Sequence, residues 1–237
     1  MKNLITKINF AIFALAATLM TACSRDAQTG VLAPLADVYI EMTHNFATLA
    51  ETYKTAEATT DPAERERLAD EIRVKNRQYE ADRQALIEKA NAIGKKCKEH
   101  GFKFTYHNHS HEFYKWPETG KTTMEMLVEG LDPETTSFVL DTFWVQTGGG
   151  DVIGWIKKLK GRIDIVHFKD MKISKPGWGS EQKMTEIGNG NLNWPAIIEA
   201  CNEAGVKYYV VEQDRDFTYN CYDSFKRSAE FLSQFDF

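Results

Sequence analysis

The sequence predicts an α/β fold in which about four parallel strands alternate with helices, after a helical hairpin. Four short apolar runs are typical of buried strands, and each delivers a His, Asp or Glu towards its C-terminal end. Helical patterns lie between these runs and after the last one. That order predicts parallel strands joined by right-handed crossovers. The four runs are Phe102–His109, Ser137–Trp144, Ile163–Asp170 and Lys207–Asp214.

The intervening helices are expected from their apolar spacing and from their start and stop signals. Pro195 lies in the first turn of one helix, and Gly205 ends it. The last helix is amphipathic, with aromatic residues on its inner face. The expected helices are Ile87–Glu99, one that contains Leu127–Leu131, Val152–Leu159, Trp194–Ala204 and Tyr222–Phe235.

A helical hairpin is expected before the strands. Apolar residues from Leu35 to Tyr53 recur at steps of three and four, which indicates one helix. Asp61 can cap a second, highly charged helix that has Pro62 at its first position. The inner face of this second helix is formed by Leu68, Ile72, Tyr79, Leu86, Ala90 and Ile93. We therefore divide the sequence into a leader (residues 1–23), a tether with the hairpin (24–84) and the α/β part (85–237).

The leader resembles a bacterial lipoprotein signal. Lys2 and Lys7 precede an apolar run, Ile8–Met20, that is too short for a confident membrane span. Small residues then lead to Cys23, the expected lipidated residue; an ordinary secretory signal is the alternative. A lipid on Cys23 would anchor an exported protein to a bacterial membrane, on the periplasmic or outer-membrane side, without a spanning helix.

Bulk composition argues against a nucleic-acid-binding surface. The net charge of the 237 residues is −5, and neither Lys nor Arg forms a long block. The remaining cysteines, Cys97, Cys201 and Cys221, fit no zinc or redox spacing. Cys97 and Cys201 stand beside apolar residues at helical positions, where packing is the simplest role.

The ends of the strands carry the candidate metal ligands. Parallel strands that end on the same side bring their last side chains together. Asp141 and Glu212 follow wholly apolar runs, where an unpaired carboxylate is costly to bury and needs a cation or hydrogen-bond donors. His167 stands at the matching position of its own run. Helix capping is the alternative role for Asp141, and a core histidine is the alternative for His167. Together these side chains suit a divalent cation.

A dense block, His107-Asn108-His109-Ser110-His111-Glu112, ends the first run. Alternate residues of a strand face the same way, so His107 and His109 can point into one site while Asn108 points away. His107 is the expected metal ligand, with His109 and Glu112 as competitors. Along the third run, Lys169 shares a face with His167, where it can bind a substrate oxygen; a surface charge is the alternative.

Five segments resemble the sugar phosphate isomerase/epimerase superfamily of xylose isomerase-like TIM barrels. They are YHNHSHEF (106–113), LDTFW (140–144), HFKD (167–170), EIGNGNLNW (186–194) and VVEQD (210–214). The resemblance implies that Asp141, His167 and Glu212 bind Mn²⁺, or else Mg²⁺, Co²⁺ or Zn²⁺. The superfamily's first ligand, a Glu, falls at His107, which is a departure. The missing carboxylate would then come from Glu112, as a ligand or as the base.

The resemblance covers only the second half of a barrel, so the fold expected is a partial (β/α) TIM-type barrel. Three explanations stay open: a second copy completes it as a homodimer, the hairpin covers the gap, or the gene product is truncated or fused. The resemblance implies a metal-dependent isomerase or epimerase that removes a proton beside a carbonyl of a small sugar or keto-sugar. Glu212 and Glu112 would move the proton, and His109, Lys169 and Trp144 would hold the substrate. The alternatives are a keto-glycoside lyase or hydratase and a non-catalytic or truncated surface lipoprotein.

Overall fold

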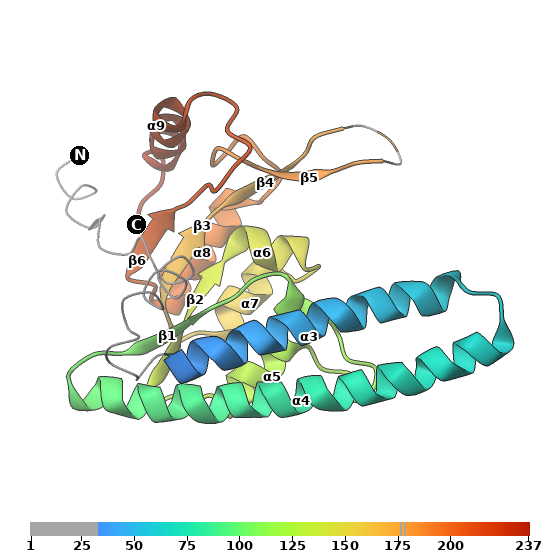
Figure 1. The fold of residues 1–237 in the computed structure, drawn as a ribbon. Helices are drawn as coiled ribbons and strands as arrows, with labels where there is room; N and C mark the ends of the chain where they lie inside the picture. Colours follow the sequence, from blue (N-terminus) through green and yellow to red (C-terminus); the bar gives the residue numbers. More distant parts are fainter. Residues whose placement is uncertain (1–32, 176, 178) are drawn as a thin grey trace. The chain divides into compact units, whose positions relative to one another are not determined.

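The computed structural model describes residues 33–237 except 176 and 178 (Figure 1). The predicted leader with Cys23 and the tether up to residue 32 lie outside the described residues. Within the described part, no helix combines the length and the apolar character that a membrane crossing requires. The chain forms two compact units, a helical unit that ends at Phe104 and an α/β unit, Thr105–Phe237.

The helical unit is the expected hairpin of two helices, α3 (Ala33–Ala58) and α4 (Pro62–Glu99). Asp61 caps α4, since its carboxylate accepts the N–H of Ala63 at 3.0 Å. Met42, Leu49 and Tyr79 are fully or almost fully buried. The sequence division at residue 85 has no counterpart in the secondary structure, because α4 runs through this position without a break.

The α/β unit contains a four-stranded sheet in the order β1-β2-β3-β6 (Figure 1). The strands are β1 (Phe104–His107), β2 (Thr136–Asp141), β3 (Ile163–Phe168) and β6 (Tyr208–Val211). β3 pairs in parallel with β2 on one side and with β6 on the other. The predicted partial barrel of parallel βα units, with a helical hairpin before it, is therefore confirmed.

Five α-helices of this unit follow or connect the strands. Capping fixes where several of them begin: Thr122 and Glu125 form a capping box at α5, and Asn193 and Asn220 cap α8 and α9. Gly205 ends α8 with a φ of 78°, a left-handed conformation that glycine adopts without strain. The helices are α5 (Thr123–Gly130), α6 (Thr142–Thr147), α7 (Val152–Lys158), α8 (Trp194–Ala204) and α9 (Cys221–Leu232).

The helix expected at Ile87–Glu99 is the C-terminal part of α4. Two further elements differ from the sequence prediction. Trp144, expected in a strand, lies in the short helix α6, because Asp141 caps that helix and ends the strand. The third run does not continue through Asp170 as one strand. It breaks after Phe168, and β4 (Asp170–Ile173) pairs antiparallel with β5 (Gln182–Thr185) in a separate hairpin (Figure 1).

Asp170 explains this break. Its buried carboxylate accepts the indole N–H of Trp194 at 2.7 Å and the backbone N–H groups of Met171, Gly188, Gly190 and Leu192. Burial raises the pKa of Asp170, and these donors oppose the rise. A β-carbon on Gly190 would lie 2.3 Å from the Asp170 Oδ1, so only glycine fits beside this carboxylate. The loop of residues 186–194 is thereby held against the end of β3.

Candidate metal centre

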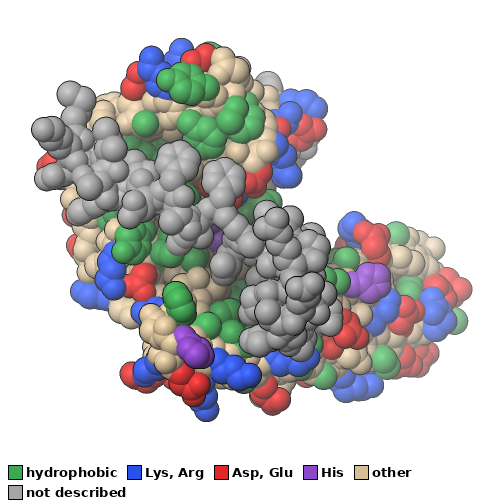
Figure 2. Space-filling model, turned by 60° about the vertical axis from the view of Figure 1, so that its left-hand side comes forward, with side chains coloured by type: hydrophobic (Ala, Val, Ile, Leu, Met, Phe, Trp, Pro, Cys, Tyr) green, Lys and Arg blue, Asp and Glu red, His purple; other side chains and the backbone are tan. Residues whose placement is uncertain are grey.

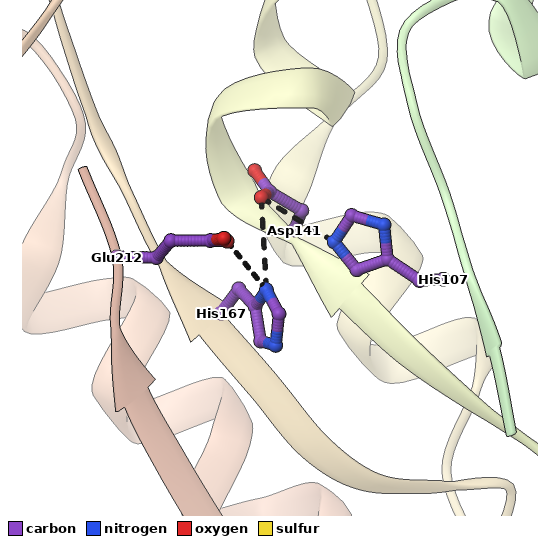
Figure 3. Close-up of side chains that lie close together, drawn as sticks. All are labelled: His107, Asp141, His167 and Glu212. Carbon is purple, nitrogen blue, oxygen red and sulfur yellow. Dashed lines mark hydrogen bonds and ion pairs between the residues drawn. The ribbon is translucent and has the colours of Figure 1, made fainter. Parts of the chain in front are cut away.

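Four side chains from the ends of the four sheet strands converge on one point (Figure 3). His107 ends β1, Asp141 ends β2, His167 lies near the end of β3, and Glu212 directly follows β6. Strand register accounts for the convergence, because Asp141 pairs with His167 and His167 pairs with Val210. One potential ligand atom from each side chain lies within 4.8 Å of all the others.

The individual distances show a loose ring of nitrogen and oxygen atoms. His107 Nε2 lies 3.6 Å and His167 Nδ1 4.0 Å from the Asp141 Oδ2. His167 Nδ1 lies 2.7 Å from the Glu212 Oε2. The Asp141 side chain is fully buried, whereas 36% of the Glu212 side chain is exposed. The ring is therefore closed at Asp141 and open to solvent at Glu212.

The donor set fits a divalent cation. Two imidazoles and two carboxylates are ligands that Mn²⁺, Co²⁺ and Zn²⁺ accept in proteins. The ring nitrogens of His107 are buried without a hydrogen bond of good geometry to the described residues, and the buried Asp141 Oδ2 has only the ion pair with Lys169 at 3.1 Å and the His107 ring at 3.6 Å beside it. Buried polar atoms are normally paired, so a buried imidazole without a hydrogen bond, next to two carboxylates, is the chemistry expected of a metal ligand.

Lys169 brings a positive charge to the same point. Its ammonium lies 3.1 Å from the Asp141 Oδ2, 3.1 Å from the Glu212 Oε2 and 3.0 Å from the Asp214 Oδ2. Burial alone would lower the pKa of Lys169, but the three carboxylates raise it to about 12. Lys169 therefore stays charged at neutral pH and is almost fully buried, so the surface-charge alternative is wrong.

The two carboxylates of the ring are ionised at neutral pH. Burial would raise the pKa of Asp141, but His107, Lys169 and His167 more than offset this and hold it below its usual range. Burial acts in the same direction on Glu212, whose pKa is nevertheless lowered by the hydrogen bond with His167 and by Lys169. Both groups can therefore serve as anionic ligands without losing a proton first.

His109 lies next to the ring of metal-ligand candidates, and Trp144 lies next to His109. The His109 ring centroid lies 5.0 Å from that of His107 and 5.5 Å from that of Trp144. The Lys169 ammonium lies 5.5 Å from the Trp144 ring. Burial lowers the pKa of His109 to about 4, so its imidazole is neutral at neutral pH. The predicted substrate-binding trio thus lies together beside the four-residue ring.

Glu112 lies outside the ring. Its buried carboxylate accepts the hydroxyl of Tyr106 at 2.7 Å through Oε1 and the backbone N–H of His109 at 2.8 Å through Oε2. These local donors satisfy both oxygens, so Glu112 holds the turn after β1. The expectation that Glu112 supplies the missing carboxylate does not match this geometry, and His107 occupies the fourth position of the ring.

Asn108 and Asp214 also contact residues of the site, although neither is predicted from the sequence as a site residue. Asn108 is fully buried, and its Oδ1 accepts the backbone N–H of Asp141 at 3.0 Å. Asp214 pairs with Lys169. A signal existed for Asp214, because it shares the period of two with Glu212. Alternation along β1 places Asn108 away from the ring, and its contact with the neighbouring strand has no sequence signature.

Comparisons with known proteins agree with this architecture. The chain matches the family model described as xylose isomerase-like TIM barrel over residues 43–234. An inosose dehydratase of Geobacillus thermodenitrificans is 30% identical over 146 residues, which cover 55% of this chain and 47% of that protein. An inosose dehydratase of Salmonella agona is 35% identical over 95 residues, or 39% of this chain and 29% of that protein.

A solved structure of a sugar phosphate isomerase/epimerase from Parabacteroides distasonis superimposes with a TM-score of 0.54 and 27% identity. The match covers 65% of this chain and 52% of that one. The chain thus spans about half the length, or less, of the relatives that it matches. Because the family model covers most of the sequence, the chain belongs to the xylose isomerase-like TIM barrel family.

Proposed function

We propose that the α/β unit binds one divalent cation and removes a proton beside the carbonyl group of a small sugar or keto-sugar. The observation that carries the proposal is the ring of His107, Asp141, His167 and Glu212, in which the buried His107 ring has no hydrogen bond of good geometry to a described residue. These four residues would hold the cation, Mn²⁺ first and Mg²⁺, Co²⁺ or Zn²⁺ as alternatives. A bound cation would polarise the carbonyl and stabilise the negative charge that develops on its oxygen.

Glu212 is the residue best placed to move the proton. It is ionised at neutral pH and is the most exposed member of the ring, so a substrate entering from solvent meets it first. Glu212 would break a C–H bond next to the carbonyl and take the proton onto its carboxylate. Returning that proton to the former carbonyl carbon, while the proton of the neighbouring hydroxyl passes to the former carbonyl oxygen, completes an isomerisation with one carboxylate base.

Lys169, Trp144 and His109 would bind the rest of the substrate. The Lys169 ammonium can donate to a substrate oxygen, since it stays charged at neutral pH. The half-buried Trp144 ring offers an apolar surface beside it. The neutral imidazole of His109 can donate or accept a hydrogen bond with a hydroxyl group. This combination of one flat ring and several hydrogen-bonding groups suits a polyhydroxylated molecule.

A second candidate is dehydration of a keto-sugar or keto-cyclitol. Two observations favour it: two relatives at 30% and 35% identity are inosose dehydratases, and only one ring carboxylate faces solvent. Epimerisation by paired acid and base would need a second proton-moving group, whereas Glu112 is occupied by Tyr106 and His109. In dehydration, Glu212 takes the α-proton, the C–O bond of the β-hydroxyl breaks, and Lys169 gives that hydroxyl the proton with which it leaves as water.

Proton exchange measured by NMR tests both candidates. The purified protein is incubated in D₂O with Mn²⁺ and a panel of ketoses and inososes. Deuterium at the carbon beside the carbonyl supports proton abstraction, and the product then separates isomerisation from loss of water. Glu212→Gln should abolish the exchange, while Glu203→Gln on the exposed face of α8 should leave it unchanged. Metal binding without any exchange would contradict catalysis and favour a binding module.

The localisation and assembly remain part of the proposal. A lipid on Cys23 would attach the protein to a bacterial membrane, and mass spectrometry of the membrane-extracted protein would detect the acylated Cys23. A second copy of the chain is the proposed partner of the partial barrel, and light scattering of the purified protein would give its mass.

On the face drawn in Figure 2, acidic and basic side chains are interspersed, an arrangement compatible with a small-molecule substrate.

A further inference from the structure

Asn108 connects two strand ends at the candidate metal centre. It follows His107 directly at the end of β1, and none of its surface is exposed. Its Oδ1 accepts the backbone N–H of Asp141, the last residue of β2, at 3.0 Å. The amide orientation is unambiguous, because a backbone N–H requires an oxygen as its acceptor. The Asn108 side chain therefore links the end of β1, next to His107, to the backbone of Asp141 at the end of β2.

Two hydrogen bonds, this one and one from Trp144, hold Asp141 in place. The Oδ1 of Asp141 accepts the backbone N–H of Trp144 at 3.0 Å, which fixes one carboxylate oxygen at the start of α6. Asn108 fixes the backbone of the same residue from the opposite strand. The Oδ2 is then the oxygen that faces His107 at 3.6 Å and His167 at 4.0 Å. The orientation of this oxygen depends on both restraints.

A purely structural role explains Asn108 poorly. Its Nδ2 is buried and has no hydrogen-bond partner among the described residues, which is unfavourable for stability. An aspartate would accept the same hydrogen bond and leave no donor unpaired. It would, however, place a second negative charge in the buried surroundings of Asp141. Asparagine is the side chain that accepts this bond while leaving Asp141 as the buried anion of the ring.

We infer that Asn108 is a positioning residue of the metal centre, which sets the Asp141 carboxylate at binding distance from His107. The inference rests on the proposed function, because it requires that the ring binds a cation. Residues that orient metal ligands typically contribute about 10- to 100-fold to metal affinity. Asn108→Ala should therefore weaken Mn²⁺ binding by this factor while the protein stays folded.

The test compares four proteins: wild type, N108A, N108D and the matched control Ser137→Ala. Ser137 is also fully buried, and its hydroxyl donates to the carbonyl of Arg162 at the opposite end of β2. For each protein, the Mn²⁺ dissociation constant is measured by calorimetry and the free energy of unfolding by denaturation without metal. The absorption spectrum of the Co²⁺-loaded protein reports the geometry of the ligands independently of stability.

The expected result is a 10- to 100-fold loss of affinity and an altered Co²⁺ spectrum in N108A. N108D keeps the acceptor oxygen and adds a negative charge, so it should retain Mn²⁺ affinity but lose stability without metal, and Ser137→Ala should lose stability alone. Unchanged affinity in N108A, or an equal loss in Ser137→Ala, would overturn the inference. If N108A does not fold, Asn108→Ser takes its place, because its hydroxyl is too short to reach Asp141. Wild type that binds no Mn²⁺ would instead refute the proposed function, and the inference with it.

Discussion

The ammonium of Lys169 lies 3.1 Å from the Asp141 Oδ2, the same carboxylate oxygen that faces both ring histidines. The site therefore has a permanent positive charge of its own next to its most buried anion. A divalent cation held by the ring would share this oxygen with Lys169. Lys169 and the cation would then both contact the same carboxylates. Without the cation, Lys169 is the main positive charge that stabilises the buried Asp141, so a change at Lys169 should affect the stability of the metal-free protein.

Lys169→Met should destabilise the metal-free protein. The substitution leaves Asp141 buried without its nearest cation, and removing one partner of a buried ion pair costs about 3–5 kcal/mol. Because Glu212 and Asp214 are partly exposed, we expect a loss of roughly 2–4 kcal/mol in the free energy of unfolding, measured by urea denaturation. Saturating Mn²⁺ should restore part of the loss. Lys183→Met, at a partly exposed position away from the ring, is the control, and an equal loss there would contradict this account.

Glu212→Gln should slow proton exchange far more than it weakens substrate binding. Glutamine keeps the shape of the side chain but cannot take up a proton, and general-base catalysis contributes about 10²- to 10⁴-fold. Because Glu212 is also a ligand of the ring, the kinetics are measured at saturating Mn²⁺, and they should show a large fall in kcat with little change in KM. A variant that retains wild-type kcat would remove Glu212 from the mechanism and transfer the base to another group.

The buried His109 should make stability depend on pH in the acid range. Its pKa is lowered to about 4 in the fold, against about 6.5 in an unfolded chain. Between these values the unfolded chain binds a proton that the folded protein does not, so stability is lost as the pH falls from about 6.5 to about 4. One such proton corresponds to a slope of at most about 1.4 kcal/mol per pH unit.

Denaturation of the metal-free protein between pH 4.5 and 7.5 measures this slope. His109→Asn should remove about one proton's contribution, whereas His100→Asn, at the exposed end of α4, should leave the slope as it is in wild type. Identical slopes in wild type and His109→Asn would show that the imidazole is protonated equally in the folded and unfolded states.

The sequence identifies the ring residues because their positions follow from a simple rule. Each apolar strand ends near a potential ligand, and parallel pairing in register brings Asp141 and His167 side by side. The same rule does not show which of His107, His109 and Glu112 is the fourth member of the ring. His107 lies in the ring, while Glu112 turns to the hydroxyl of Tyr106, a contact that depends on the three-dimensional path of the turn.

Other features depend on hydrogen bonds that no pattern encodes. From the sequence, Asp141 is either a helix cap or a metal ligand. In the structure its Oδ1 caps α6, while its Oδ2 faces His107 in the ring. The hairpin of β4 and β5 also escapes the sequence analysis, because strand continuation through Asp170 looks equally regular. Only the loop of residues 186–194, which surrounds the Asp170 carboxylate, decides that the sheet strand ends at Phe168.

The most direct test of the central claim is metal stoichiometry in the purified protein. After removal of metals with a chelator and titration with Mn²⁺, wild type should bind one ion per chain. Asp141→Asn should lose that binding, and Asp164→Asn should keep it, because Asp164 lies on β3 outside the ring and pairs with Lys207. Wild type that binds no ion, or Asp141→Asn that binds as tightly as wild type, would contradict the assignment of a metal centre to these four residues.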